Sequence, residues 1–212
     1  ELAEKMVGTS VGWVERGAAP APGPARLALT GLSLPSAEPF GMSLSDVTLE
    51  ARAGEIVGIA GVAGEGQAEL FAALSGERLA PEAGMVAIDG QPVGRASVTA
   101  RRRLGAAFAP EERNGHAAVG EMTLADNIVL SHHAAAGLAR RGVIDRAGAR
   151  SWAQRVREAF DVRGGEGWAA LARSLSGGNL QKFVIGREIL REPGVLVVNQ
   201  PTWGVDAGAA AV

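Results

Sequence analysis

Leu175-Ser176-Gly177-Gly178-Asn179, followed by Leu180-Gln181-Lys182, is the most specific pattern in this sequence. Ser176 has a side chain preferred at the residue before a helix, where its hydroxyl accepts a hydrogen bond from a backbone N–H further on. Gly177 and Gly178 have no side chains, so the first N–H groups of such a helix are open to an approaching anion. The stretch therefore predicts a helix start that can contact a phosphate. An ordinary helix start is the alternative interpretation, and the motifs around it argue against that.

A second glycine-rich stretch lies upstream, between an apolar run at 55–60 and helix-forming residues at 68–74. Its glycines keep the spacing of a phosphate-binding loop, G-x-x-x-x-G-K-[ST], which joins a strand to a helix. Gln67 and Ala68 stand where that loop has its lysine and its hydroxyl. A neutral hydrogen bond contributes about 0.5–1.5 kcal/mol and one to a charged group about 1.5–3 kcal/mol, so we expect weak phosphate binding. The candidate nucleotide-binding residues are Gly61, Gly64, Glu65, Gly66, Gln67 and Ala68. Taken alone, the glycines also fit a simple strand–helix turn.

A third stretch, Val195 to Val198, is a short apolar strand that is followed by Asn199-Gln200-Pro201-Thr202. In their order and spacing the three stretches resemble the motifs of ABC transporter ATPases: the L-S-G-G-Q signature, the phosphate loop, and an apolar strand followed by Asp-Glu-Pro-Thr. The resemblance covers roughly Leu27 to Ala209. It implies an α/β P-loop NTPase (ABC ATPase) core with an antiparallel β subdomain and a helical signature subdomain, truncated at the C-terminus.

The resemblance also assigns roles to these positions. In ABC ATPases the signature contacts nucleotide that the partner domain holds, so Ser176, Gly177, Gly178 and Asn179 are expected to act at the opposite site. An aspartate at position 199 would support magnesium, and a glutamate at position 200 would orient water. Asn199 and Gln200 keep the shape of those side chains and lose the charge. With Gln67 and Ala68 they make four defects in one site, so we expect no intact catalytic residue and no metal ligand here.

Two further segments resemble contact regions of the same family. Phe108-Ala109-Pro110-Glu111-Glu112-Arg113 is similar to the segment that couples ABC domains to permeases, with Glu111 at the usual glutamine position. Asp206 stands in a loop that is usually found at the dimer interface, although it could equally cap a helix. His116, His132 and His133 all precede the strand at 195–198, so none can be the switch histidine that follows it. We expect all three at the surface.

The ends of the sequence look like cut points. Glu1 to Gly8 resembles the end of a preceding nucleotide-binding domain, and residues 1–24 are expected to be that tail plus a proline-rich linker. Residues 25–212 are expected to form one incomplete ABC nucleotide-binding domain with a helical subdomain at about 120–180. Gly66-Gln67, Asn179 and Gln200-Pro201-Thr202 resemble the second, degenerate half of tandem importer ATPases for simple sugars and nucleosides.

Local patterns predict the main elements of this domain. Leu27 and Leu29 alternate as in an edge strand, and further strands are expected at 44–51, 55–60, 85–88, 104–109 and 195–198. Asp89-Gly90 is a turn signal. We expect the strands at 85–88 and 104–109 to be short and paired. Residues 68–74 and most of 123–171 have helical patterns.

Composition excludes several classes of function. The net charge is −2, from 21 basic and 23 acidic residues. This balance gives no excess positive charge to bind a polyanion, so we expect no nucleic-acid partner. The chain has no cysteine, so disulfides and thiolate metal sites are excluded. The apolar runs are far shorter than the roughly 18–20 residues that span a bilayer.

We therefore expect an ATP-binding, energy-coupling component of a bacterial importer for simple sugars or nucleosides, peripheral at the cytoplasmic face of the membrane. Mg2+ would act at the partner half's site and weakly or not at all here. The expected partners are a preceding nucleotide-binding domain, transmembrane permease subunits and, indirectly, an extracytoplasmic substrate-binding protein. The alternatives are a soluble, non-transport ABC-type ATPase and an independently active P-loop ATPase.

Overall fold

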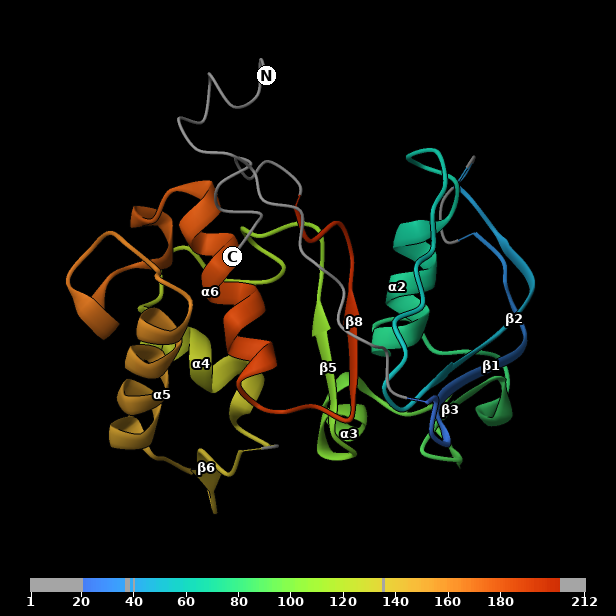
Figure 1. The fold of residues 1–212 in the computed structure, drawn as a ribbon, viewed down its shortest axis with the longest axis horizontal. Coiled ribbons are helices and arrows are strands. Elements are labelled where there is room, and N and C mark those ends of the chain that lie inside the picture. Colours follow the sequence, from blue (N-terminus) through green and yellow to red (C-terminus); the bar gives the residue numbers. More distant parts are fainter. Residues whose placement is uncertain (1–20, 37–38, 40, 135, 203–212) are drawn as a thin grey trace. The chain divides into compact units, whose positions relative to one another are not determined.

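The computed structural model describes residues 21–36, 39, 41–134 and 136–202. The described residues form two compact units. The first contains 21–108 and 192–199, and the second contains 109–191 and 200–202. Figure 1 labels the α-helices and most of the strands of both units.

An antiparallel sheet forms one layer of the first unit. Its strands are β1 (Ala25–Leu34), β2 (Leu44–Arg52), β3 (Val86–Ile88) and β4 (Gln91–Pro92), in the order β2-β1-β3-β4. Leu29 of β1 faces Leu49 on one side and Val86 on the other. The prediction that Leu27 and Leu29 belong to an edge strand is therefore wrong, because β1 has a paired strand on both sides. Asp89 and Gly90 both have positive φ, of 50° and 73°, and make the predicted turn between β3 and β4.

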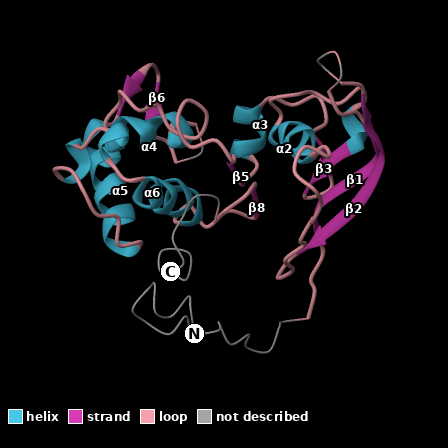
Figure 2. Ribbon diagram, turned by 90° about the horizontal axis from the view of Figure 1, so that it is seen from above, coloured by secondary structure: helices cyan, strands magenta, loops and turns pink. Residues whose placement is uncertain are grey.

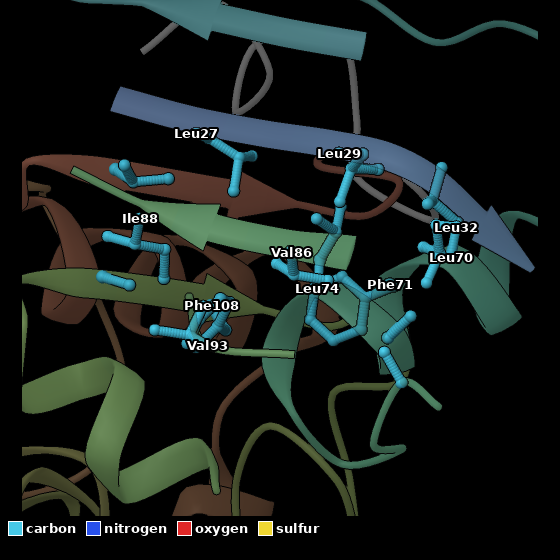
Figure 3. Packing of buried hydrophobic residues seen from close by; sticks show 14 of the residues in the cluster. Leu27, Leu29, Leu32, Leu70, Phe71, Leu74, Val86, Ile88, Val93 and Phe108 are labelled. Carbon is cyan, nitrogen blue, oxygen red and sulfur yellow. The ribbon is translucent and has the colours of Figure 1, made fainter. Parts of the chain in front are cut away.

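Helix α2 (Gln67–Ser75) packs on this sheet and closes the core. Phe71 and Leu74 of α2 lie with Leu29 and Val86 in one buried cluster (Figure 3). The 3-10 helix η1 (Ala83–Met85) lies between α2 and β3, and helix α3 (Val98–Arg103) lies between β4 and β5. Strands β5 (Ala106–Ala109) and β8 (Val195–Val198) pair with each other, and α2 contacts β8. The core thus holds the helix that follows the phosphate loop against the strand that precedes Asn199.

The predicted strand at 55–60 does not form. Residues 55–60 have no strand geometry, and Ile56 and Ile59 are 93% and 55% exposed. The apolar pattern predicts a strand, but a strand also needs a neighbour that pairs with its backbone. No described strand pairs with this run, so the local pattern alone does not decide its structure.

The second unit is mainly helical, as the sequence predicts. Its helices are α4 (Leu124–His132), α5 (Arg146–Ala159) and α6 (Gly177–Ile189), with the 3-10 helices η2 (Gly167–Ala169) and η3 (Ala172–Ser174). Helix α5 contacts α4, α6 and η2, and Figure 2 shows the three α-helices gathered together. A small hairpin of β6 (Ala139–Arg140) and β7 (Val143–Ile144) interrupts the helical run, and the sequence patterns did not predict it.

One histidine of the second unit lies where the sequence did not predict it. His132 is fully buried, whereas His116 is exposed, so the expectation of surface histidines is wrong for His132. Its Nδ1 is 2.8 Å from Ser131 Oγ, and its ring meets Trp152 edge to face at 5.0 Å. The burial follows from the packing of α4 against α5.

In the part of the chain that the structure describes, no helix is long and apolar enough to span a bilayer.

Candidate nucleotide-binding motifs

The phosphate loop, residues 61–68, lies in the first unit and leads into α2. Gly64 and Gly66 adopt φ of 90° and 103°, a left-handed conformation that glycine adopts without strain. A Cβ at Gly64 would meet no atom within 4 Å, so the loop is open to solvent at that point. Gly66 is the N-cap of α2 and gives no side-chain hydrogen bond to the helix. The first N–H groups of α2 therefore lack a side-chain cap, which is the backbone arrangement that binds anions.

Gln67 turns its side chain back onto this loop. Its Nε2 donates to the carbonyl of Val62 over 2.9 Å, and Glu65 N donates to the same carbonyl over 3.2 Å. A Cβ at Gly61 would lie 2.8 Å from Gln67 Nε2, so the amide lies directly against the start of the loop. Ala68 is exposed and has only a methyl group. The amide thus stabilises the loop itself, and neither side chain adds a positive charge or a metal ligand.

Arg101 anchors α2 from the opposite end, a role that the sequence patterns did not reveal. Its guanidinium is buried and donates to the carbonyls of Ala73 and Leu74 in the last turn of α2, the latter over 2.8 Å. Gly94 O accepts a further hydrogen bond over 3.1 Å. Burial lowers the pKa of Arg101 to about 10, so the group is still charged at neutral pH. A buried cation that binds helix C-terminal carbonyls complements the negative end of the helix dipole.

The two amides at the predicted positions of the catalytic acids, Asn199 and Gln200, follow β8. Asn199 is half-buried at the end of this strand and belongs to the same unit as the phosphate loop. Gln200 is exposed and has φ of 52°, an unfavourable left-handed conformation for a residue with a side chain. Pro201 follows, and its ring fixes the next backbone angle. The chain therefore leaves β8 through a stiff turn.

The signature, residues 175–179, has the predicted helix start. Ser176 is the N-cap of α6, and its Oγ accepts a hydrogen bond from Asn179 N over 3.4 Å. Gly177 and Gly178 form the first turn of the helix with no positive φ. Their contribution is therefore the missing side chain and not an unusual backbone conformation. Asn179 is half-buried, while Ser176 and Gly177 are exposed at this end of the helix.

The side chain of Asn179 joins the signature to the segment before it. Its Nδ2 donates to Ser176 Oγ over 2.9 Å, and its Oδ1 accepts from Arg163 N over 2.7 Å. Arg163 also donates to Asp161, and this lowers the pKa of the Asp161 carboxyl below its usual value. Lys182 of α6 lies 3.8 Å from the same carboxylate. Asparagine at this position thus has a defined structural role in the second unit.

Arg113, the last residue of the predicted coupling segment at 108–113, contacts the predicted signature. Arg113 Nη1 donates to the carbonyl of Gly177 over 3.0 Å, across 64 residues of sequence. Glu111, the residue singled out from the sequence, is half-buried, and it is the arginine two positions later that makes this contact. The sequence pattern alone does not distinguish Arg113 from the other charged residues of this segment. A direct bond between the two predicted motifs is therefore a structural finding.

A buried polar network supports the chain that follows this segment. Asn127 of α4 accepts from Val119 N and donates to the carbonyls of Val119, Met122 and Thr123. Arg187 of α6 donates to Asn127 O over 3.2 Å and to Ala117 O over 3.0 Å. The Arg187 side chain is 3% exposed, and its partner Glu188 is fully buried. The loop at 117–123 is therefore fixed to both α4 and α6.

Comparison with known proteins identifies the family of this chain. The profile of the family described as ABC transporter matches residues 44–203. The chain belongs to the ABC transporter family. Its fold is the mixed α/β fold of the ABC-type P-loop NTPases. A dimeric ATP-binding cassette in a post-hydrolysis state with ADP and Pi matches with a TM-score of 0.70, at 22% identity, over 86% of this chain and 77% of that one.

ABC importer proteins are among the similar sequences. The nucleoside import ATP-binding protein NupA of Lactococcus lactis subsp. cremoris is 37% identical over 99% of this chain and 41% of its own length. The glucose import ATP-binding protein TsgD13 of Haloferax volcanii is 39% identical over 99% of this chain and 38% of its own length. The guanosine import ATP-binding protein NupO of Bacillus subtilis is 35% identical. The chain thus spans about two fifths of the length of these relatives.

The predicted ABC site residues fall into two groups within the described chain. The phosphate loop and Asn199 lie in the first unit, and the signature, Glu111 and Gln200 lie in the second. Asp206 and the segment Glu1 to Gly8 lie outside the described residues, so those expectations stay predictions. Across the described ranges, no group of three or more histidine or acidic side chains could hold a metal ion.

Proposed function

We propose that this chain is the hydrolysis-deficient half of a tandem ATP-binding protein that drives import of nucleosides or simple sugars. Its signature, with Ser176, Gly177 and Gly178, acts on nucleotide held by a preceding nucleotide-binding domain of the same polypeptide. Magnesium and hydrolysis belong to that partner site, and ATP binds this half weakly or not at all. The relatives named as nucleoside, glucose and guanosine import proteins support this class of substrate.

The contrast between Gln67 and Ser176 carries the proposal. Gln67 donates to Val62 O within its own loop and supplies no charge. Ser176 and the two glycines keep an exposed helix start at which backbone N–H groups can bind phosphate. One region has therefore lost the groups that hydrolysis needs, whereas the other keeps the groups that contact a phosphate.

The remaining partners follow from the same proposal. Residues 110–113 contact permease subunits, which receive solute from an extracytoplasmic binding protein. The protein is then peripheral at the cytoplasmic face of the membrane. The bond from Arg113 to Gly177 supports this, because it joins the proposed permease contact to the proposed nucleotide contact within one compact unit.

Two variants of the full-length protein, each purified with its permease, test the proposal. Gly178→Asp places a carboxylate where a phosphate must approach, so like-charge repulsion and the added side chain should abolish hydrolysis and uptake. Gln67→Ala removes one neutral hydrogen bond from a site without metal ligands, so hydrolysis should fall less than about threefold. The proposal is wrong if Gln67→Ala is as damaging as Gly178→Asp.

A further inference from the structure

Gln181 connects the signature helix to the turn after β8. Gln181 lies in the second turn of α6, and only 4% of its surface is exposed. Its Nε2 donates to the carbonyl of Pro201 over 2.9 Å, across 20 residues of sequence. Both residues belong to the second unit. The bond therefore joins the element that contains the signature to the turn that contains Gln200.

The packing of α6 does not by itself explain an amide at this position. Its neighbours Leu180, Phe183 and Val184 are buried hydrophobic residues. Gln181 Oε1 is buried and finds no hydrogen-bond partner among the described residues, a condition that costs about 1–3 kcal/mol. An apolar side chain of the same size would avoid that cost. The hydrogen bond to Pro201 is the feature that a glutamine gains and an apolar residue would lose.

The backbone of the turn at Gln200 and Pro201 is conformationally restricted. Gln200 has a φ of 52°, and the proline ring fixes φ of residue 201, so the backbone that leads to the Pro201 carbonyl has one rotatable bond fewer than at another residue. Gln181 is four residues after Gly177, which corresponds to about 6 Å along a helix with a rise of 1.5 Å per residue. One helix without a break therefore joins the residue that binds the turn to the first turn of α6.

We propose that Gln181 is a positioning residue that sets the signature through the Gln200–Pro201 turn. The turn that has lost its catalytic acid would then serve as a support for Ser176, Gly177 and Gly178. This rests on the proposed function, in which the signature acts on nucleotide of the partner domain. In this proposal, the sequence Asn199-Gln200-Pro201-Thr202 has a structural role in the intact protein, and that role does not require acidic side chains.

Steady-state hydrolysis by the full-length protein with its permease tests the role of Gln181. Gln181→Met keeps the size of the side chain and removes the donor, so kcat should fall about tenfold, while the KM for ATP changes less than twofold. Gln154→Met is the matched control, since Gln154 is an exposed amide of α5 that donates to Glu158 Oε1 over 2.7 Å. The control should keep the original kcat. Rates are normalised to the amount of folded protein, so a loss of stability alone does not count.

A second variant changes the acceptor side of the hydrogen bond from Gln181 to Pro201. Pro201→Gly keeps the carbonyl and releases the turn, so kcat should fall about threefold even if Gln181→Met does not fold. The inference is overturned if kcat is unchanged in Pro201→Gly and in any folded Gln181→Met protein. Gly178→Asp in the same assay separates the two proposals. If it leaves hydrolysis intact, the proposed function fails, and if it abolishes hydrolysis while Gln181→Met equals its control, only the positioning role fails.

Discussion

The phosphate loop and the signature are both glycine-rich starts of a helix, yet side chains fix them differently. Helix α6 begins after the N-cap Ser176. Asn179 donates a hydrogen bond to the Ser176 hydroxyl, and Arg113 donates one to the carbonyl of Gly177. Helix α2 begins at Gly66 without a side-chain cap and is held by Arg101 at its other end. Both helix starts therefore contain glycines, and the surrounding side chains decide whether the turn has a fixed position and a useful charge.

The largest expected effect concerns the anchor of α2. Arg101→Met removes a buried guanidinium and leaves the carbonyls of Ala73 and Leu74 without this donor. We expect the free energy of unfolding to fall by more than about 2 kcal/mol, because each buried acceptor that is left without a donor costs about 1–3 kcal/mol. Urea denaturation of the full-length protein measures it.

Arg95→Met is the control for this change. Arg95 is exposed and also donates to a backbone carbonyl, that of Pro81. It should cost less than about 1 kcal/mol, as is usual for surface substitutions. Equal effects of the two variants would show that α2 does not depend on its buried anchor.

A smaller effect should separate capping from function at α6. Ser176→Ala removes the N-cap hydroxyl and should lower the free energy of unfolding by about 1 kcal/mol. Thr123→Ala removes the cap of α4, where Thr123 Oγ1 accepts from Asp126 N over 3.1 Å, and should cost a similar amount. Only Ser176→Ala should also slow ATP hydrolysis, by about tenfold, because only that hydroxyl is proposed to contact nucleotide. Similar hydrolysis rates in both variants would assign Ser176 a structural role alone.

The smallest expected effect is on ATP affinity, when the residues typical of a phosphate-binding loop are introduced at positions 67 and 68. Gln67→Lys combined with Ala68→Thr restores a cation and a hydroxyl, so ATP should bind this half severalfold more tightly, in line with the roughly 1 kcal/mol advantage of a charged hydrogen bond. Hydrolysis at this half should not appear, because Asn199 and Gln200 are still amides. Calorimetry with a full-length protein whose partner site is inactivated measures the binding, and the single variant Ala68→Thr is the control. Unchanged affinity would mean that the loop lacks the backbone geometry for phosphate.

Short-range features of this fold were predictable from the sequence, and long-range ones were not. The cap at Ser176, the turn at Asp89-Gly90 and the strand at 195–198 depend on neighbouring residues and are confirmed. The strand expected at 55–60 depends on a pairing partner that its own pattern does not specify. Arg101, Arg113 and Gln181 act through bonds to residues 28, 64 and 20 positions away. No periodicity or motif spacing reveals such contacts.

The proposed division of roles between this chain and a preceding domain has a direct test. The phosphate-loop lysine of that proposed domain is replaced by alanine in the full-length protein, and ATP hydrolysis is measured with the permease present. If this half only donates its signature, hydrolysis falls to the background of a protein-free control, because Gln67, Ala68, Asn199 and Gln200 supply neither charge nor metal ligands. Steady turnover that persists in this variant and disappears on Gln67→Ala would contradict the proposal, since the second site would then be active by itself.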